Sequence, residues 1–207
     1  MNKSIVYLIC LMVLLFVGIT GCGPQDETRT FPNTRYVESY DGARVPVPDH
    51  PKRILALSSA SDTILLGLVE PDRLAGINTL STYEEYSLEA KRAKLVKPAM
   101  SSYPLEKIIA LEPDLVIAPD YTSADVIAGL RHMGIPTVVV PTGTTVESVI
   151  KNVTDIAHIV GEDEKGQFYE QKIRRELEKM KRLGTSIPLN QRKSVLFVSS
   201  MDGYTGT

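Results

Sequence analysis

The sequence lacks an excess of charge of either sign. Its 207 residues include 23 Lys or Arg and 25 Asp or Glu, which gives a formal net charge of −2. Proteins that bind nucleic acid concentrate Lys and Arg on one segment or face, and no such basic cluster stands alone in this chain. Nucleic acid is therefore excluded as a partner. The hydrophobic content of 43% is ordinary for a globular protein and excludes intrinsic disorder as a class.

Cysteine is nearly absent, with Cys10 and Cys22 both near the start of the chain. Lys3 precedes a long apolar run, and the letters TGC follow that run. This pattern is typical of a secretory signal with a small-residue cleavage site, so we expect residues 1–21 to be removed. The mature chain would then hold no disulfide, and a packed core must supply its stability. An uncleaved anchor helix is the alternative, because the run is just long enough to cross a bilayer.

The residues just before Cys22 resemble the bacterial lipobox, in which the cysteine is lipidated and becomes the new N-terminus. The resemblance implies acyl chains such as palmitate on Cys22 and a protein held at the extracytoplasmic face of the cell membrane. Residues 22–49 begin with a polar, proline-containing stretch that shows no apolar period. We expect them to form the lipidated cysteine and a flexible tether.

From Arg53 onward the chain alternates between strand-like and helical patterns. Short apolar runs predict strands at 53–57, 73–77, 114–118 and 137–140. The stretches between them predict helices at 62–69, 83–91, 104–111 and 124–133. Because the strand-like runs are apolar at successive positions, the strands should be buried on both faces, as in a parallel sheet covered by helices. Residues 50–145 are therefore expected to form a Rossmann-like α/β lobe.

Residues 146–184 predict a helical connector with one interruption near Gly161. Its second part, 162–183, carries apolar positions on a strongly charged background, which favours a long helix lying across a surface. A further strand is predicted at 194–200, and it would open a new sheet seven residues before the last residue. We therefore expect 185–207 to be the start of an incomplete second α/β lobe, and the chain to be a fragment.

Three segments carry a resemblance to a known family: HPKRILALSSASDTILLGL, LEKIIALEPDLVIAP and LRHMGIPTVVVP. With the long helix, they resemble the substrate-binding lipoproteins of ABC importers, in the class that serves ferric siderophores, haem and vitamin B12. The resemblance covers about 50–200. It implies two Rossmann-like lobes joined by one rigid bridging helix, with the ligand between them. It also implies an ABC permease as partner and, through it, an ATPase.

The resemblance includes one departure at the surface that docks on the permease. Members of this class usually carry a Glu on the helix after the first strand, where it pairs with Arg of the permease, and Thr63 stands at that position here. The neighbouring Asp62 is the candidate replacement. The alternative is that Asp62 serves as an N-terminal helix cap.

Candidate ligand-binding residues follow the predicted strands, because ligands of open α/β sheets bind beyond the carboxyl ends of the strands. They are Ser59, Ser61, Thr79, Tyr83, Ser101, Ser102, Tyr103, Asp120, Tyr121 and Thr142. Tyrosine is the informative type, because its ring is a rigid platform and its hydroxyl can donate to a chelate oxygen or ligate haem iron. The alternative for each tyrosine is simple surface packing.

Histidine is scarce, and the three in the chain, His50, His132 and His158, do not follow the carboxyl end of any predicted strand. A site for bare zinc or manganese needs several converging His and carboxylate ligands, so we expect a whole chelate as ligand and no resident metal or cofactor. The sequence contains no His-Glu-x-x-His or Gly-x-Ser-x-Gly motif and no Gly-rich phosphate loop. An exported enzyme and a nucleotide-binding domain are therefore disfavoured.

Together these features predict a non-enzymatic, exported receptor that captures an iron chelate, a ferric siderophore or haem, and delivers it to an ABC permease. Two alternatives stay open. One is a corrinoid-binding protein of the same class. The other is a lipoprotein that keeps the fold but binds a protein partner.

Overall fold

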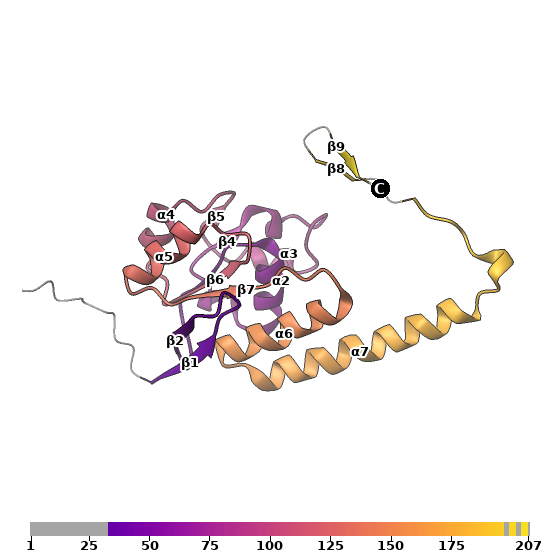
Figure 1. Cartoon of the computed structure of the whole chain (residues 1–207), viewed down its shortest axis with the longest axis horizontal. Helices are drawn as coiled ribbons and strands as arrows, with labels where there is room; N and C mark the ends of the chain where they lie inside the picture. The colour runs from indigo at the N-terminus through magenta and orange to yellow at the C-terminus, as the bar shows by residue number, and fades with distance from the viewer. Residues whose placement is uncertain (1–32, 197–198, 202–203, 207) are drawn as a thin grey trace, which may run out of the picture. The chain divides into compact units, whose positions relative to one another are not determined.

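The computed structural model describes residues 33–196, 199–201 and 204–206 (Figure 1). The predicted signal peptide and the lipidation of Cys22 lie outside these ranges. In the described ranges, no helix combines the length and the apolar character needed to cross a bilayer.

A parallel sheet forms the centre of the lobe, as predicted. Strands β3 (Ile54–Ala56), β6 (Leu115–Pro119) and β7 (Thr137–Val140) pair in the order β3-β6-β7. A second parallel pair, β4 (Ile77–Asn78) and β5 (Ala99–Met100), continues beyond β3, because Ile54 pairs with Leu115 on one side and bridges to Leu74 on the other. The residues of β3, β6 and β7 are all buried, as apolar runs require.

Helices cover both faces of this sheet. Side chains alternate along a strand, so Ile54 and Ala56 join one hydrophobic core with α2 (Ser59–Leu68) and α6 (Val146–Val160). Leu55 joins the other core with α4 (Leu105–Ala110) and α5 (Ala124–His132). The lobe is a doubly wound α/β fold, and the carboxyl ends of β3, β6 and β7 meet at one edge.

Local sequence explains where the helices begin and end. Ser58 caps α2, since its side chain accepts a hydrogen bond from the N–H of Ser61. Pro113 ends α4, and Glu112 before it has a left-handed φ of 47°. Helix α6 begins with a capping box between Thr145 and Ser148. It ends at Gly161, whose φ is 76°, so the predicted interruption of the connector is present.

Helix α7 (Asp163–Ser186) follows at once and packs closely on α6. A Cβ added at Gly166 would lie 2.5 Å from the Cβ of Ala157, so the crossing leaves no room for a side chain there. Tyr169 packs beside Gly67 of α2. The chain continues through the short helix η3 (Leu189–Gln191) to the hairpin β8 (Ser199–Met201) and β9 (Tyr204–Gly206).

The tether predicted for 22–49 is wrong over most of its second half. Strands β1 (Thr34–Glu38) and β2 (Arg44–Pro48) form an antiparallel hairpin, and Val37, Val45 and Val47 are buried in the first core. The prediction of a tether rested on the polar stretch at the start of 22–49, whereas the valines of β2 stand at every second position, which is the signal of a strand. Prolines are tolerated there because β2 pairs with a single strand.

Three predicted elements also differ. The strand predicted at 73–77 is the short helix η1 (Pro71–Arg73) followed by β4, which begins only at Ile77. The helix predicted at 83–91 is reduced to α3 (Ala90–Ala93), preceded by η2 (Thr79–Thr82). The strand predicted at 194–200 is present at β8 alone in the described residues, and 194–196 has no regular structure. At 73–77 and 83–91, caps and turns decide where the regular elements begin, and apolar residues alone do not mark those points.

Candidate functional site

The connections of the sheet define where a ligand can bind. From β3 the chain moves outward to β4 and β5, then returns to the other side of β3 as β6 and continues to β7. The order of strands therefore reverses between β3 and β6, and such a switch point leaves a crevice at the carboxyl ends of the strands. A cleft of about 390 Å³ lies there.

We call this hollow the switch-point cleft. It is lined by Ser58, Ala60, Ser61, Thr63, Ile64, Pro119, Tyr121, Val140, Pro141, Thr142, Gly143, Val149, Asn152 and Ile156. The lining comes from the start of α2, the ends of β6 and β7, and one face of α6.

The start of α2 contributes two buried hydroxyl groups. The Oγ of Ser58 accepts from the N–H of Ser61 at 3.2 Å, and its hydroxyl donates to the Oγ of Ser61 at 3.0 Å. Both hydroxyls line the cleft, and a hydroxyl can donate to or accept from a polar group that enters it.

The loops after β6 and β7 are tied together at the rim of the cleft. The carboxylate of Asp120 accepts from the hydroxyl of Thr142 at 2.6 Å and from its N–H at 3.1 Å. These hydrogen bonds hold the pKa of Asp120 below its ordinary value, so this rim carries a negative charge at neutral pH. Tyr121 is next along the chain and is 72% exposed, which leaves its ring available as a platform.

Helix α6 supplies an amide to the same cleft. Asn152 is buried, and its Nδ2 donates to the carbonyl of Pro141 at 2.8 Å. Sequence reasoning missed Ser58, Thr63 and Asn152. Ser58 was missed because the helix was expected to begin at residue 62, three residues after the start of α2, and a capping serine directly after a predicted strand was the available signal. Nothing local to Asn152 marks it, since only the packing of α6 on the sheet brings it there.

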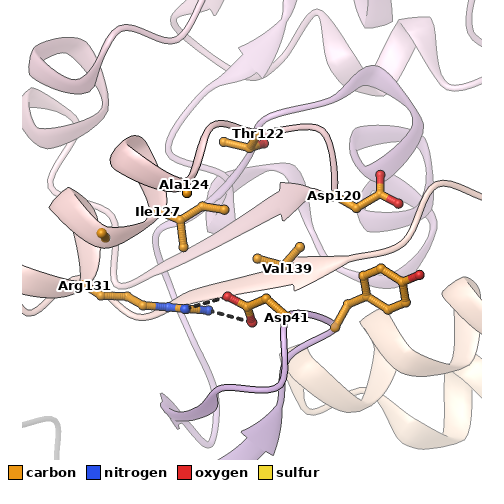
Figure 2. A pocket seen from close by; sticks show the side chains of 9 residues that line it. Asp41, Asp120, Thr122, Ala124, Ile127, Arg131 and Val139 are labelled. Atoms are coloured by element: carbon orange, nitrogen blue, oxygen red, sulfur yellow. Dashed lines mark hydrogen bonds and ion pairs between the residues drawn. The ribbon is translucent and has the colours of Figure 1, made fainter.

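A second hollow of about 400 Å³ lies between α5 and the turn of the β1–β2 hairpin. Figure 2 shows Arg131 and Asp41 pointing toward one another there, and their closest atoms are 2.7 Å apart. The guanidinium of Arg131 lowers the pKa of Asp41 to about 2. Arg131 also donates to the carbonyl of Thr137. The pair fastens the hairpin to α5, and Asp120 lies at the border of this second hollow.

The structure brings Ser61, Tyr121 and Thr142 together in the switch-point cleft, with Asp120 beside them. The other sequence candidates do not line it: Ser59, Thr79, Tyr83, Ser101, Ser102 and Tyr103. Most of these follow β4 or β5, further along the sheet edge. Tyr83 is exposed and packs edge-to-face on Tyr86, as the surface alternative described.

Tyr103 is instead partly buried against the second core. Its hydroxyl is buried and has no hydrogen-bond partner within the described residues. Burial, and then the nearby carboxylate of Asp62, raise the pKa of this hydroxyl well above its ordinary value. The hydroxyl of Tyr103 is therefore neutral at neutral pH.

Asp62 is not available for docking, which corrects the sequence prediction. Its side chain is 0% exposed, and its Oδ2 accepts from the N–H of Asn78 at 2.8 Å and from the hydroxyl of Ser81 at 2.9 Å. Burial raises the pKa of Asp62 to about 7. It is not the helix cap either, because Ser58 fills that role. Asp62 instead holds the segment after β4 against α2.

Clustered metal ligands are also absent from the part of the chain that the structure describes, where no group of three or more His, Cys, Asp or Glu side chains converges. His158, on α6, pairs with Asp163 at 2.8 Å. The polar groups of the switch-point cleft are hydroxyls and one amide, which recognise a ligand through hydrogen bonds.

Residues 54–207 match the periplasmic binding protein family. The chain therefore belongs to that family. Among curated proteins, it is 28% identical over 203 residues to an uncharacterized ABC transporter substrate-binding lipoprotein of Bacillus subtilis. This match covers 92% of this chain and 62% of that protein.

Two further relatives have names that state a ligand. The chain is 31% identical over 134 residues to a vitamin B12-binding protein of Vibrio campbellii, covering 63% of this chain and 46% of that protein. It is 27% identical over 169 residues to an iron(3+)-hydroxamate-binding protein of Bacillus subtilis, covering 78% and 47%. The chain thus spans about half to three fifths of the length of these relatives.

Solved structures show the same fold. A periplasmic solute-binding protein of Veillonella parvula superposes with a TM-score of 0.64 at 20% identity, over 76% of this chain and 50% of that one. The apo haem-binding protein of Roseiflexus sp. RS-1 gives a TM-score of 0.57 at 19% identity, over 66% and 51%.

Proposed function

We propose that this chain is the substrate-binding component of an ABC importer, which captures an iron chelate, a ferric siderophore or haem, and delivers it to the membrane permease. The observation that carries the proposal is the position of the switch-point cleft, at the strand reversal of a periplasmic binding protein lobe. The name of the iron(3+)-hydroxamate-binding relative and the haem-binding structure support this ligand class. The chelate is the cargo, and the role requires no catalytic step and no resident cofactor.

Affinity in this proposal comes from burying the ligand against a preformed wall. The sheet fixes the positions of Ser61 and Thr142, because each follows a buried strand within a few residues. The hydroxyl of Ser61 and the ring of Tyr121 would meet the polar rim and the apolar face of the ligand, respectively.

A corrinoid is the second candidate ligand. It is favoured by the vitamin B12-binding relative, whose identity of 31% is the highest of the three relatives described above. A corrinoid presents a large macrocycle with amide groups at its edge, and a cleft with hydroxyls, one amide and an exposed ring suits such an edge.

Export and anchoring complete the proposal. Cys22 would be lipidated, for example with palmitate, and would hold the protein at the outer face of the cell membrane, where the permease and, through it, the ATPase are its partners. The named lipoprotein relative supports this placement. Metabolic labelling with a palmitate analogue tests it, and Cys22→Ala should abolish the label while Cys10→Ala leaves it unchanged.

Binding of the cargo is tested by native mass spectrometry of the protein purified from its own membranes. The protein is mixed in turn with a ferric hydroxamate, a ferric catecholate, haem and cobalamin. Retention of one of these at one equivalent would support the receptor role and name the cargo. Retention of none by the folded protein would refute that role.

A further inference from the structure

The lining of the switch-point cleft carries no formal charge. Its described residues are serine, threonine, asparagine and tyrosine among alanine, glycine, proline and aliphatic side chains, and none is Lys, Arg, His, Asp or Glu. The hydrogen-bonding groups are therefore neutral hydroxyls and one amide. An anionic ligand would find no opposite charge on this wall.

Charged groups around the cleft also disfavour an anionic ligand. The carboxylate of Asp120 stands at the rim, and in the described residues it forms no ion pair. Its low pKa keeps it charged at neutral pH. On the neighbouring helices, Arg131 of α5 pairs with Asp41, and Lys151 of α6 pairs with Asp155 at 2.5 Å.

The free energy of transfer decides which ligand such a wall accepts. A charged group that leaves water without a paired charge pays a large desolvation cost, whereas a neutral amide or carbonyl is compensated by one or two hydrogen bonds. A fixed carboxylate at the rim raises the cost for anions further, because like charges repel. Neutral ligands with an apolar body and polar oxygens avoid both penalties.

We propose that the switch-point cleft selects an electrically neutral chelate or macrocycle that carries carbonyl or amide groups, and discriminates against polyanionic chelates. Three singly charged hydroxamates neutralise one ferric ion, whereas three doubly charged catecholates leave a strongly negative complex, and haem carries two carboxylates. Neutral ferric hydroxamates and corrinoids are therefore the preferred cargo. This inference rests on the proposed function and narrows its ligand class.

The test measures the dissociation constants of a neutral ferric trihydroxamate, cobalamin, a ferric tris-catecholate and haem. Quenching of tyrosine fluorescence reports binding, because the chain contains no tryptophan, and calorimetry provides a second measurement. A neutral ligand should bind at least about 10-fold more tightly than either anionic one, the factor that about 1.4 kcal/mol represents. Its affinity should stay constant between about 0.02 and 0.5 M salt, because no ion pair is there to be screened. Tighter binding of the catecholate or haem, or a steep loss of neutral-ligand affinity with salt, would overturn the inference.

A charge placed in the cleft sharpens the test. Thr63 lines the cleft and is partly exposed, so Thr63→Lys adds a cation to the wall. The variant should bind the catecholate about 10-fold more tightly than the unmodified protein at low salt, and the gain should shrink at high salt. Gln167→Lys adds the same charge at an exposed position of α7, outside the cleft, and should change nothing.

Different results would refute the receptor role and the selection for neutral cargo. If all four ligands fail to bind the folded protein, the receptor role itself is refuted, and the charge selection with it. If one of the anionic ligands binds most tightly, the receptor role stands and the selection for neutral cargo is refuted.

Discussion

Arg73 Nη1 lies 2.5 Å from Glu162 Oε1, and both side chains are about one fifth exposed, at 21% and 20%. The same guanidinium donates to the carbonyls of Val160 and Pro51. Arg35, from β1, donates to the carbonyl of Ile159 in the last turn of α6. Two arginines from the lobe therefore donate hydrogen bonds to the carbonyl groups at the end of α6 and fix the point where α7 begins.

Loss of the carboxylate at this joint should destabilise the protein. Glu162→Gln leaves the guanidinium of Arg73 without its charged partner, and we expect the free energy of unfolding to fall by about 1–2 kcal/mol. Urea denaturation followed by circular dichroism measures the change. Glu164→Gln, at an exposed position two residues further along α7, is the matched control and should stay within about 0.5 kcal/mol. Equal stability of the two variants would contradict the structural role of the pair.

The crossing of α6 and α7 gives a second prediction, because two glycines of the same helix have opposite surroundings. A Cβ at Gly166 would lie 2.5 Å from the Cβ of Ala157, whereas a Cβ at Gly184 would meet nothing within 4 Å. Gly166→Ala should therefore lower the free energy of unfolding by about 1–3 kcal/mol through overpacking.

Gly184→Ala provides the control and should be neutral or stabilising by up to about 1 kcal/mol, since alanine is the better helix former. Thermal unfolding of both variants distinguishes the two effects. A stabilising Gly166→Ala would show that α6 and α7 are further apart than the structure places them.

The sequence reveals the parts of this fold that depend on local patterns. Consecutive apolar residues mark β6 and β7 as buried parallel strands, and Pro113 and Gly161 mark helix ends by their backbone preferences. Burial that depends on tertiary packing is not visible in the same way. Asp62 looks like an exposed residue near a helix start, yet it is fully buried because the segment after β4 folds over it.

The residues of the candidate site also fall into two groups, those that local sequence predicts and those that depend on tertiary packing. Tyr121 and Thr142 follow strands directly, so the rule for carboxyl ends finds them. Asn152 reaches the cleft from the middle of α6, and only the packing of that helix on the sheet places it there. The β1–β2 hairpin was not predicted, because the tether was extended from the polar stretch at the start of 22–49, although Val45 and Val47 recur at every second position of β2 and both lie in the core.

Asp62 should make stability depend on pH. Its pKa is about 7 in the folded protein and about 3.9 in an unfolded chain. The folded state therefore holds a proton that the unfolded state has released. The stability that this group contributes is complete below about pH 4 and is lost as the pH rises through 7.

The variant Asp62→Asn removes this ionisation while keeping an oxygen that can accept from Asn78 and Ser81. Relative to the unmodified protein, it should gain about 2–4 kcal/mol of unfolding free energy between pH 4 and pH 8. Denaturant titrations at several pH values measure this difference. Asp72→Asn, at an exposed position, is the control and should show no such gain. A constant difference between Asp62→Asn and the unmodified protein at every pH would contradict the buried ionisation.

The last prediction concerns the switch-point cleft and rests on the proposed function. Tyr121 lines the cleft and is 72% exposed, and Tyr86 is equally exposed at 72% but lies outside it. Because an aromatic platform contributes roughly 1 kcal/mol or more when a ligand covers it, Tyr121→Ala should weaken ligand binding about 10-fold. Tyr86→Ala should leave the dissociation constant unchanged. Both variants replace a solvated ring, so neither should change the free energy of unfolding by more than about 0.5 kcal/mol. Native mass spectrometry identifies the ligand, and calorimetric titration with that ligand measures the dissociation constants of both variants. An unchanged affinity of Tyr121→Ala would place the ligand elsewhere on the lobe.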